Sequence, residues 1–150
     1  MRERRARPLL IAATAVVLGA VVLLLIVPRP AALPPGATAL ALPTQPWKPW
    51  PLGGLGCPMA LVAPARVGRD GDAMVFWRID IRERIVLIWP SGYSARLLEA
   101  RAELVAPDGS VLAREGDVIS NLAGGAADDG TILLCFDFAS KPVVEPSTGA

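Results

Sequence analysis

The chain has 150 residues, of which 53% are hydrophobic, 15 are basic, 14 are acidic and none is histidine. Without histidine, its own side chains cannot perform Ser-His or Cys-His nucleophilic catalysis, bind zinc through imidazole or use imidazole as a general base. Residues 57–138 contain eight arginines and twelve acidic residues. The resulting net charge of −4 argues against nucleic acid as a partner.

The first predicted element is a membrane-spanning helix from Leu9 to Val27, a run of 19 uncharged residues. At 1.5 Å per residue it would span about 28 Å, close to the thickness of the hydrocarbon layer. Four arginines in residues 1–8 precede it, an asymmetry that predicts a cytoplasmic N-terminus. We therefore expect a single-pass protein of the cytoplasmic membrane, held in the lipid bilayer through Leu9 to Val27, with an extracytoplasmic C-terminal domain.

A cleaved signal peptide is the alternative for this segment, since it also pairs basic residues with an apolar run. Its apolar core is usually about 7 to 15 residues long and ends near a cleavage site of small residues. The candidate sites at 37–39 and 39–41 lie well beyond Val27. These spacings favour an uncleaved anchor.

Residues 28–51 contain eight prolines and predict a semi-rigid stalk in an extended polyproline II conformation. Trp47 and Trp50 near its end are expected to fold back onto the domain surface, with recognition by another protein as the alternative. The exported domain is assigned to residues 52–139. Residues 140–150, with two prolines and small polar side chains, predict a disordered tail.

The sequence of this domain predicts short strands rather than helices. Arg84 to Trp89 is rich in β-branched and apolar residues and predicts a central strand. Arg101 to Ala106 and Ser110 to Glu115 flank Pro107-Asp108-Gly109, which predicts a hairpin.

One further turn and one loop organise the rest of the domain. Leu61 to Val67 and Ala73 to Ile79 flank a turn-like cluster at 68–72. The pattern also predicts a short strand at 118–120, a flexible, acidic, glycine-rich loop from Asn121 to Gly130, and a last strand from Thr131 to Phe138.

Five or six short strands in about 80 residues predict an all-β domain, with a small barrel favoured over a compact sandwich because closure removes exposed edges. The strong central strand, the hairpin and the glycine-rich loop before a closing strand resemble the OB-fold barrels of exported bacterial proteins over residues 57–138. In membrane-anchored haem chaperones of that fold a histidine holds the haem. The resemblance therefore implies a fold here and no haem.

Cys57 and Cys135 both fall in the exported domain, where the oxidising compartment predicts a disulfide between them. The alternative is a soft-metal site, such as that of a copper carrier, because Cys57, Met59 and Met74 are sulfur ligands. Two cysteines without a histidine form a small ligand set, so we predict no metal site and no cofactor.

The aspartates offer a second alternative, an envelope hydrolase that cleaves glycans with a pair of carboxylates. None of them is spaced as in a calcium loop or another known motif, which favours an interpretation as turn residues and solvated charges. We predict no catalytic residue. The aspartates considered are Asp70, Asp72, Asp117, Asp128, Asp129 and Asp137.

A basic and aromatic run supplies the only candidate ligand-binding residues. Arginine and tryptophan together can bind a polyanion or a sugar by charge and stacking. The alternative is a solvated strand edge above core tryptophans. The candidate residues are Trp77, Arg78, Arg82, Arg84, Trp89 and Tyr93.

Together the anchor, the stalk and the missing catalytic residues predict a non-catalytic binding or interaction module of the bacterial cell envelope. Its expected partner is an envelope protein or a glycan.

Overall fold

The computed structural model describes residues 29–46, 60–126, 130–135 and 142–147. These residues form thirteen short strands and no helix. The strands are β1 (Thr38–Leu40), β2 (Ala60–Val62), β3 (Ala65–Asp70), β4 (Ala73–Arg78), β5 (Arg84–Ile85), β6 (Leu87–Ile88), β7 (Ser94–Leu98), β8 (Arg101–Val105), β9 (Val111–Arg114), β10 (Val118–Ser120), β11 (Leu122–Ala126), β12 (Ile132–Leu134) and β13 (Val143–Glu145). Within these ranges no helix is long and apolar enough to cross a membrane. The predicted spanning segment, Leu9 to Val27, lies outside them.

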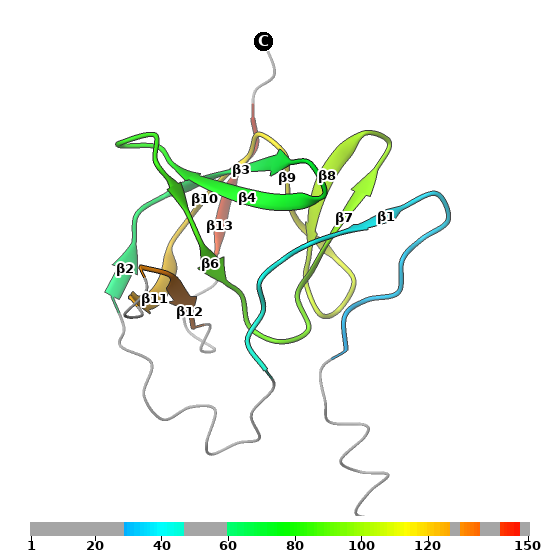
Figure 1. Ribbon diagram of the computed structural model, residues 1–150, viewed down its shortest axis with the longest axis horizontal. Helices are drawn as coiled ribbons and strands as arrows, with labels where there is room; N and C mark the ends of the chain where they lie inside the picture. Colours follow the sequence, from blue (N-terminus) through cyan, green and yellow to red (C-terminus); the bar gives the residue numbers. More distant parts are fainter. Residues whose placement is uncertain (1–28, 47–59, 127–129, 136–141, 148–150) are drawn as a thin grey trace, which may run out of the picture.

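Three sheets make up the fold, with strand orders β1-β7-β8-β9, β13-β10-β3-β4-β5 and β2-β11-β12-β6 (Figure 1). The prediction of an all-β domain is confirmed. The prediction of one closed barrel with five or six strands is wrong for the described residues, because none of these three sheets closes on itself. The chain passes from sheet to sheet after only a few residues, as between β2 and β3, β5 and β6, and β10 and β11.

Both predicted turns occur. Around Gly109 (φ 86°), β8 pairs with β9, and the Asp108 carboxylate accepts hydrogen bonds from the Ser110 N–H at 2.9 Å and the Ser110 hydroxyl at 2.6 Å. The β3–β4 turn is tighter than the predicted cluster, since Asp70 already pairs with Ala73 around Gly71 (φ 60°). Local turn chemistry thus located both hairpins.

The predicted central strand from Arg84 to Trp89 is wrong. It divides into β5, at the edge of one sheet, and β6, at the edge of another. Val86 stands between them with 43% of its surface exposed. An apolar run indicates burial but not which sheet receives each residue, so the sequence could not reveal this division.

The predicted glycine-rich loop from Asn121 to Gly130 is also wrong over most of its described length, because Leu122–Ala126 form β11 between β2 and β12. A Cβ atom at Gly124 would lie 2.5 Å from the carbonyl oxygen of Leu133. Here glycine allows two backbones to approach closely.

Part of the predicted stalk belongs to the folded domain. Thr38–Leu40 pair with β7, and Leu40 is buried. Beyond β1, the Ala41 N–H donates to Asp72 O at 2.7 Å, and the Gln45 side-chain amide donates to Leu134 O at 2.7 Å. Residues 38–45 therefore contact all three sheets, and the domain begins before residue 52.

Proline did not prevent this pairing, because Pro43 contributes only its carbonyl, which accepts from the Trp89 N–H at 2.9 Å. The predicted disordered tail is wrong at Val143–Glu145, which pair with β10 as strand β13.

One hydrophobic core joins the three sheets, and each sheet contributes to it. Trp89 is fully buried in this core, and its ring centroid lies 5.6 Å from that of Phe76 and 5.3 Å from that of Tyr93. The other core residues include Leu40, Val67, Leu87, Leu104, Ile119, Leu122 and Leu134.

Candidate binding surface

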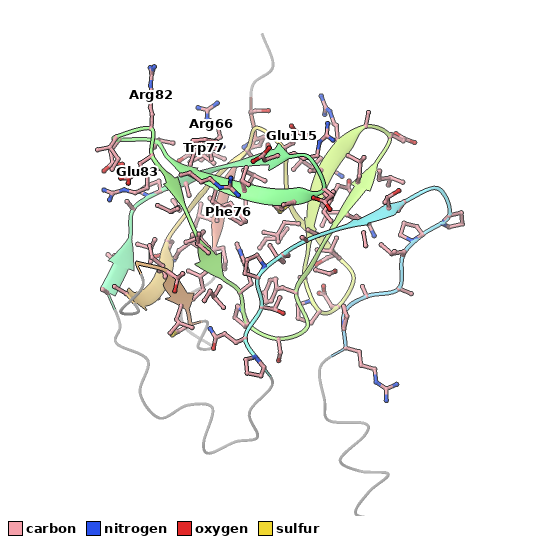
Figure 2. All side chains as sticks on the ribbon, viewed as in Figure 1. Arg66, Phe76, Trp77, Arg82, Glu83 and Glu115 are labelled. Atoms are coloured by element: carbon pink, nitrogen blue, oxygen red, sulfur yellow. The ribbon has the colours of Figure 1, made fainter. Side chains whose placement is uncertain are left out.

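A hollow of about 440 Å³ opens beside the β3–β4 hairpin. It is lined by Arg66, Trp77, Arg78, Ile79 and Arg82, which we call the Trp77 surface. Figure 2 shows Arg66, Trp77 and Arg82 on the same side of the molecule. The structure thus brings together three of the six predicted ligand-binding residues and adds two that the sequence did not indicate.

Trp77 lies on the outer face of β4, directly opposite Arg66 of β3 on one side and Arg84 of β5 on the other. Its side chain leans over Gly68, where a Cβ would lie 3.2 Å from the indole Nε1. Trp77 remains 41% exposed. A large apolar side chain is therefore presented to solvent by a paired strand.

Arg78 is held by its neighbour in the β4–β5 loop. Its Nε donates to Asp80 Oδ1 at 3.1 Å, and a terminal nitrogen donates to Oδ2. This hydrogen bond lowers the pKa of Asp80 and raises that of Arg78. The Arg78 N–H also donates to Glu83 O at 2.9 Å, which closes the loop.

Arg82 occupies an unusual backbone conformation near the end of that loop. Its φ of 55° lies in the left-handed region, which costs a side-chain-bearing residue about 1 kcal/mol or more. Ile79 and Ile81 in the same loop are 45% and 52% exposed. The loop thus presents two isoleucines and an arginine to solvent.

Arg84 does not line this hollow. Its Nη1 contacts Asp70 Oδ2 at 3.0 Å, in an exposed ion pair. Arg84 instead borders a smaller hollow of about 130 Å³ shared with Ala41, Pro43 and Val86.

Trp89 and Tyr93 belong to the core. Trp89 is fully buried, and Tyr93 is half-buried against it. Burial, followed by the charge of Asp108, raises the pKa of Tyr93. The burial of Trp89 supports the alternative interpretation, in which it is a core tryptophan and not a ligand-binding residue.

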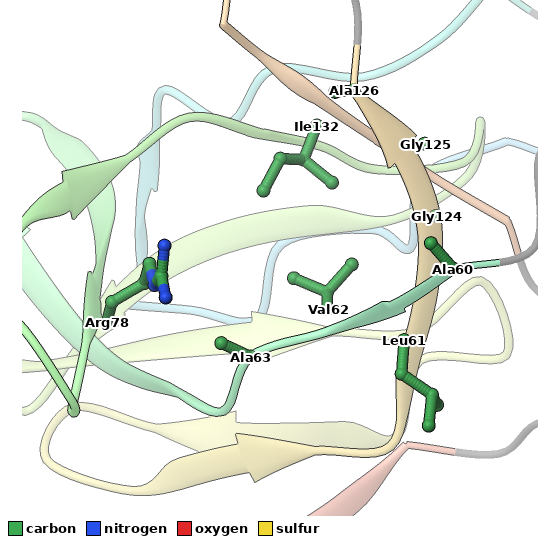
Figure 3. Close-up of a pocket in the computed structure, with 9 residues that line it drawn as sticks. All are labelled: Ala60, Leu61, Val62, Ala63, Arg78, Gly124, Gly125, Ala126 and Ile132. Atoms are coloured by element: carbon green, nitrogen blue, oxygen red, sulfur yellow. The ribbon is translucent and has the colours of Figure 1, made fainter.

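A second hollow of about 300 Å³ is also lined by Arg78 (Figure 3). Val62 and Ile132 contribute apolar side chains to it, and Gly124 and Gly125 contribute backbone. Arg78 lines both hollows, so its pairing with Asp80 affects the charge of each.

Several carboxylates serve structural roles. Asp117 accepts from the Arg114 N–H at 2.8 Å and the Ser147 N–H at 2.9 Å. Glu103, only 6% exposed, lies between Arg96 and Arg114. Among the described residues, no group of three or more histidine, cysteine or acidic side chains is placed to hold a metal ion.

The sulfur chemistry falls partly outside the described residues. Cys57 and Met59 lie there, as do Asp128, Asp129 and Asp137. Met74 is buried in the core, and Cys135 follows β12. The Cys57–Cys135 disulfide therefore stays a prediction.

Sequence reasoning missed Arg66 and Ile79. A signal for Arg66 was present, because counting outward from the Gly71-Asp72 turn places it opposite Trp77. Ile79 follows Trp77 by two residues, but it lies one residue beyond the end of β4. Strand periodicity alone does not place it.

Comparison of the chain with protein-family models, with curated proteins and with solved structures finds no match.

Proposed function

We propose that this chain is a membrane-anchored, extracytoplasmic and non-catalytic binding module of the bacterial cell envelope, and that it binds its partner at the Trp77 surface. The observation that carries this proposal is the combination of an exposed tryptophan with arginines around one hollow. Tryptophan and arginine are the residue types most enriched where binding energy concentrates. Exposed apolar side chains in a hollow of this size are typical of ligand sites.

The placement of the surface suits a tethered module. In Figure 1 the described chain begins at the lower right of the coloured ribbon (blue), whereas Figure 2 places Arg66, Trp77 and Arg82 toward the top. The point where the described chain enters the domain is therefore separate from the Trp77 surface. The excess of arginine before the apolar run supports an extracytoplasmic location.

An uncleaved anchor and the Cys57–Cys135 disulfide are parts of the same proposal. An exported location would allow the disulfide to form. Neither a carboxylate hydrolase nor a soft-metal carrier gains support from the described residues, several of whose carboxylates serve turns and ion pairs, as Asp108, Asp117 and Glu103 do.

The proposal is tested by cross-linking the full chain in intact membranes and identifying what it captures. Wild type is compared with Trp77→Ala and with Arg101→Ala, an exposed arginine at the start of β8 on a different sheet. We expect a specific partner that Trp77→Ala loses and Arg101→Ala keeps. Recovery of nothing specific, or equal recovery by both variants, would refute the proposed surface.

Location needs its own experiment. A C-terminal reporter that is active only outside the cytoplasm is expected to be active on the full chain and inactive when the arginines of residues 1–8 are moved to follow Val27. Activity of a cytoplasm-only reporter would overturn the orientation.

A further inference from the structure

We infer that the partner's contact with the Trp77 surface is an acidic protein segment that places one large apolar side chain in the hollow and carboxylates against Arg66 and Arg82. This inference rests on the proposed function and adds the chemistry of the partner.

The charges of the surface select an acidic ligand. Nearby arginines have carboxylate partners, as in Arg78–Asp80, Arg84–Asp70 and Arg69–Glu115. Arg66 and Arg82 have no ion pair with any described residue. Because residues 57–138 carry a net charge of −4, attraction of an acidic segment must be local to these two arginines.

The apolar part of the surface selects a large side chain. Trp77, Ile79 and Ile81 expose 41%, 45% and 52% of their surfaces close together in sequence. The hollow of about 440 Å³ is large enough for one phenylalanine or leucine side chain. Burial of such a side chain is favourable enough to define an anchor position.

Hydrogen-bonding capacity separates a protein segment from a neutral glycan. The side chains of the Trp77 surface can only donate, because guanidinium and indole N–H groups have no acceptor and isoleucine has neither. Sugar hydroxyls need acceptors as well as donors. Aspartate and glutamate carboxylates only accept, so they match these donors.

The test uses the full chain in nanodiscs of neutral lipid and three fluorescently labelled peptides of eight residues. One is acidic with a central phenylalanine, the second has serine in place of phenylalanine, and the third has lysines in place of the acids. Anisotropy titrations are expected to show binding of the first peptide, with about tenfold weaker binding of the second. The third is expected not to bind.

Charge reversal provides the matched variants. Arg66→Glu or Arg82→Glu should weaken binding of the acidic peptide about tenfold, whereas Arg101→Glu should change it less than about twofold. The double variant Arg66→Glu/Arg82→Glu should bind the lysine peptide. All of these side chains are exposed, and thermal unfolding verifies that each variant is folded.

Oligogalacturonate and vesicles of anionic lipid complete the experiment. Tighter binding of either one than of the acidic peptide, or equal effects of reversal at Arg101 and Arg82, would overturn the inference. Capture of a partner through Trp77 without peptide binding would overturn it while the proposed function stands. Capture of no partner through Trp77 would instead count against the proposed function.

Discussion

Arg78 donates from its Nε and from a terminal nitrogen to the carboxylate of Asp80, two residues further along the β4–β5 loop. The ion pair neutralises the one arginine that borders both hollows. The hydrogen bond from Arg78 lowers the pKa of Asp80 below the ordinary aspartate value. The ion pair is therefore fully formed above the ordinary aspartate pKa, and it is lost only as the pH falls through the lowered pKa of Asp80. Arg78 therefore stays paired at neutral pH.

Asp80→Asn should release Arg78 to a ligand. We expect the acidic phenylalanine peptide to bind about threefold more tightly at low salt, because a third guanidinium becomes available. Added salt should remove the gain. Anisotropy titration at two salt concentrations measures both effects. Asp108→Asn, in the turn between β8 and β9, is the matched control, and an equal gain there would show that the effect is not local to Arg78.

Arg82→Gly should stabilise the fold and weaken binding. Glycine adopts a φ of 55° without the side-chain clash, so the free energy of unfolding should rise by up to about 1 kcal/mol. The same change removes a cation from the Trp77 surface and should weaken peptide binding about tenfold. Urea unfolding and anisotropy measure the two effects.

Glu99→Gly is the control for that prediction. Glu99 also has a positive φ, 49°, and lies between β7 and β8. Its replacement should stabilise without changing affinity. If Arg82→Gly kept full affinity, Arg82 would have no role in recognition.

Glu103→Gln should destabilise the domain strongly. Glu103 is buried on β8, with Arg96 Nε at 2.9 Å and Arg114 Nε at 3.2 Å from its carboxylate oxygens. Removing its charge leaves the nearly buried Arg96 without a counter-charge, which costs about 3 to 5 kcal/mol. Urea denaturation tests this, with the exposed Glu145→Gln expected within about 0.5 kcal/mol of wild type. Equal effects would contradict the prediction.

Gly124→Ala should lower the free energy of unfolding by about 3 kcal/mol, because the added methyl group would force β11 away from the Leu133 backbone. Gly130→Ala separates this contact from backbone strain. Gly130 has a φ of 80° and, its chain neighbours aside, no atom of the described residues lies within 4 Å of the position its Cβ would take, so its replacement should cost only about 1 kcal/mol. Thermal unfolding compares the two variants. A smaller loss of stability for Gly124→Ala than for Gly130→Ala would contradict the close approach of β11 and β12.

Reduction should destabilise the chain, because we predict a disulfide between Cys57 and Cys135. Opening a loop of this length should lower the free energy of unfolding by about 4 kcal/mol. Unfolding with and without reductant measures the loss, and a Cys57→Ser/Cys135→Ser variant should not respond to reductant. Alkylation of both thiols without prior reduction, detected by mass spectrometry, would show that no bridge exists.

The sequence predicted those parts of the fold that depend on neighbouring residues. Pro107-Asp108-Gly109 and the cluster at 68–72 located the β8–β9 and β3–β4 hairpins, because turn conformations are governed by the residues within the turn. The apolar, β-branched segments predicted an all-β domain. For the candidate site, the sequence indicated Trp77, Arg78 and Arg82, which are close together in the chain.

Long-range pairing was not predictable in the same way. β1 pairs with β7 across more than fifty residues, and nothing local in 38–40 distinguishes a strand from an extended stalk. Likewise, Gly124-Gly125 suggests a flexible loop until Leu133 is known to lie against it. Such pairings depend on partners that are distant in sequence.

By itself, the sequence determined the all-β class, the two hairpin turns and the absence of histidine chemistry from this chain, because each follows from local residue chemistry. Only the tertiary structure decided that Trp89 is buried while Trp77 is exposed, and that Arg66 stands beside Trp77. The tertiary structure also decided that residues 38–45 pair with or hydrogen-bond to the sheets. Burial and neighbourhood depend on how separate strands pack together, and that information is distributed over the whole chain.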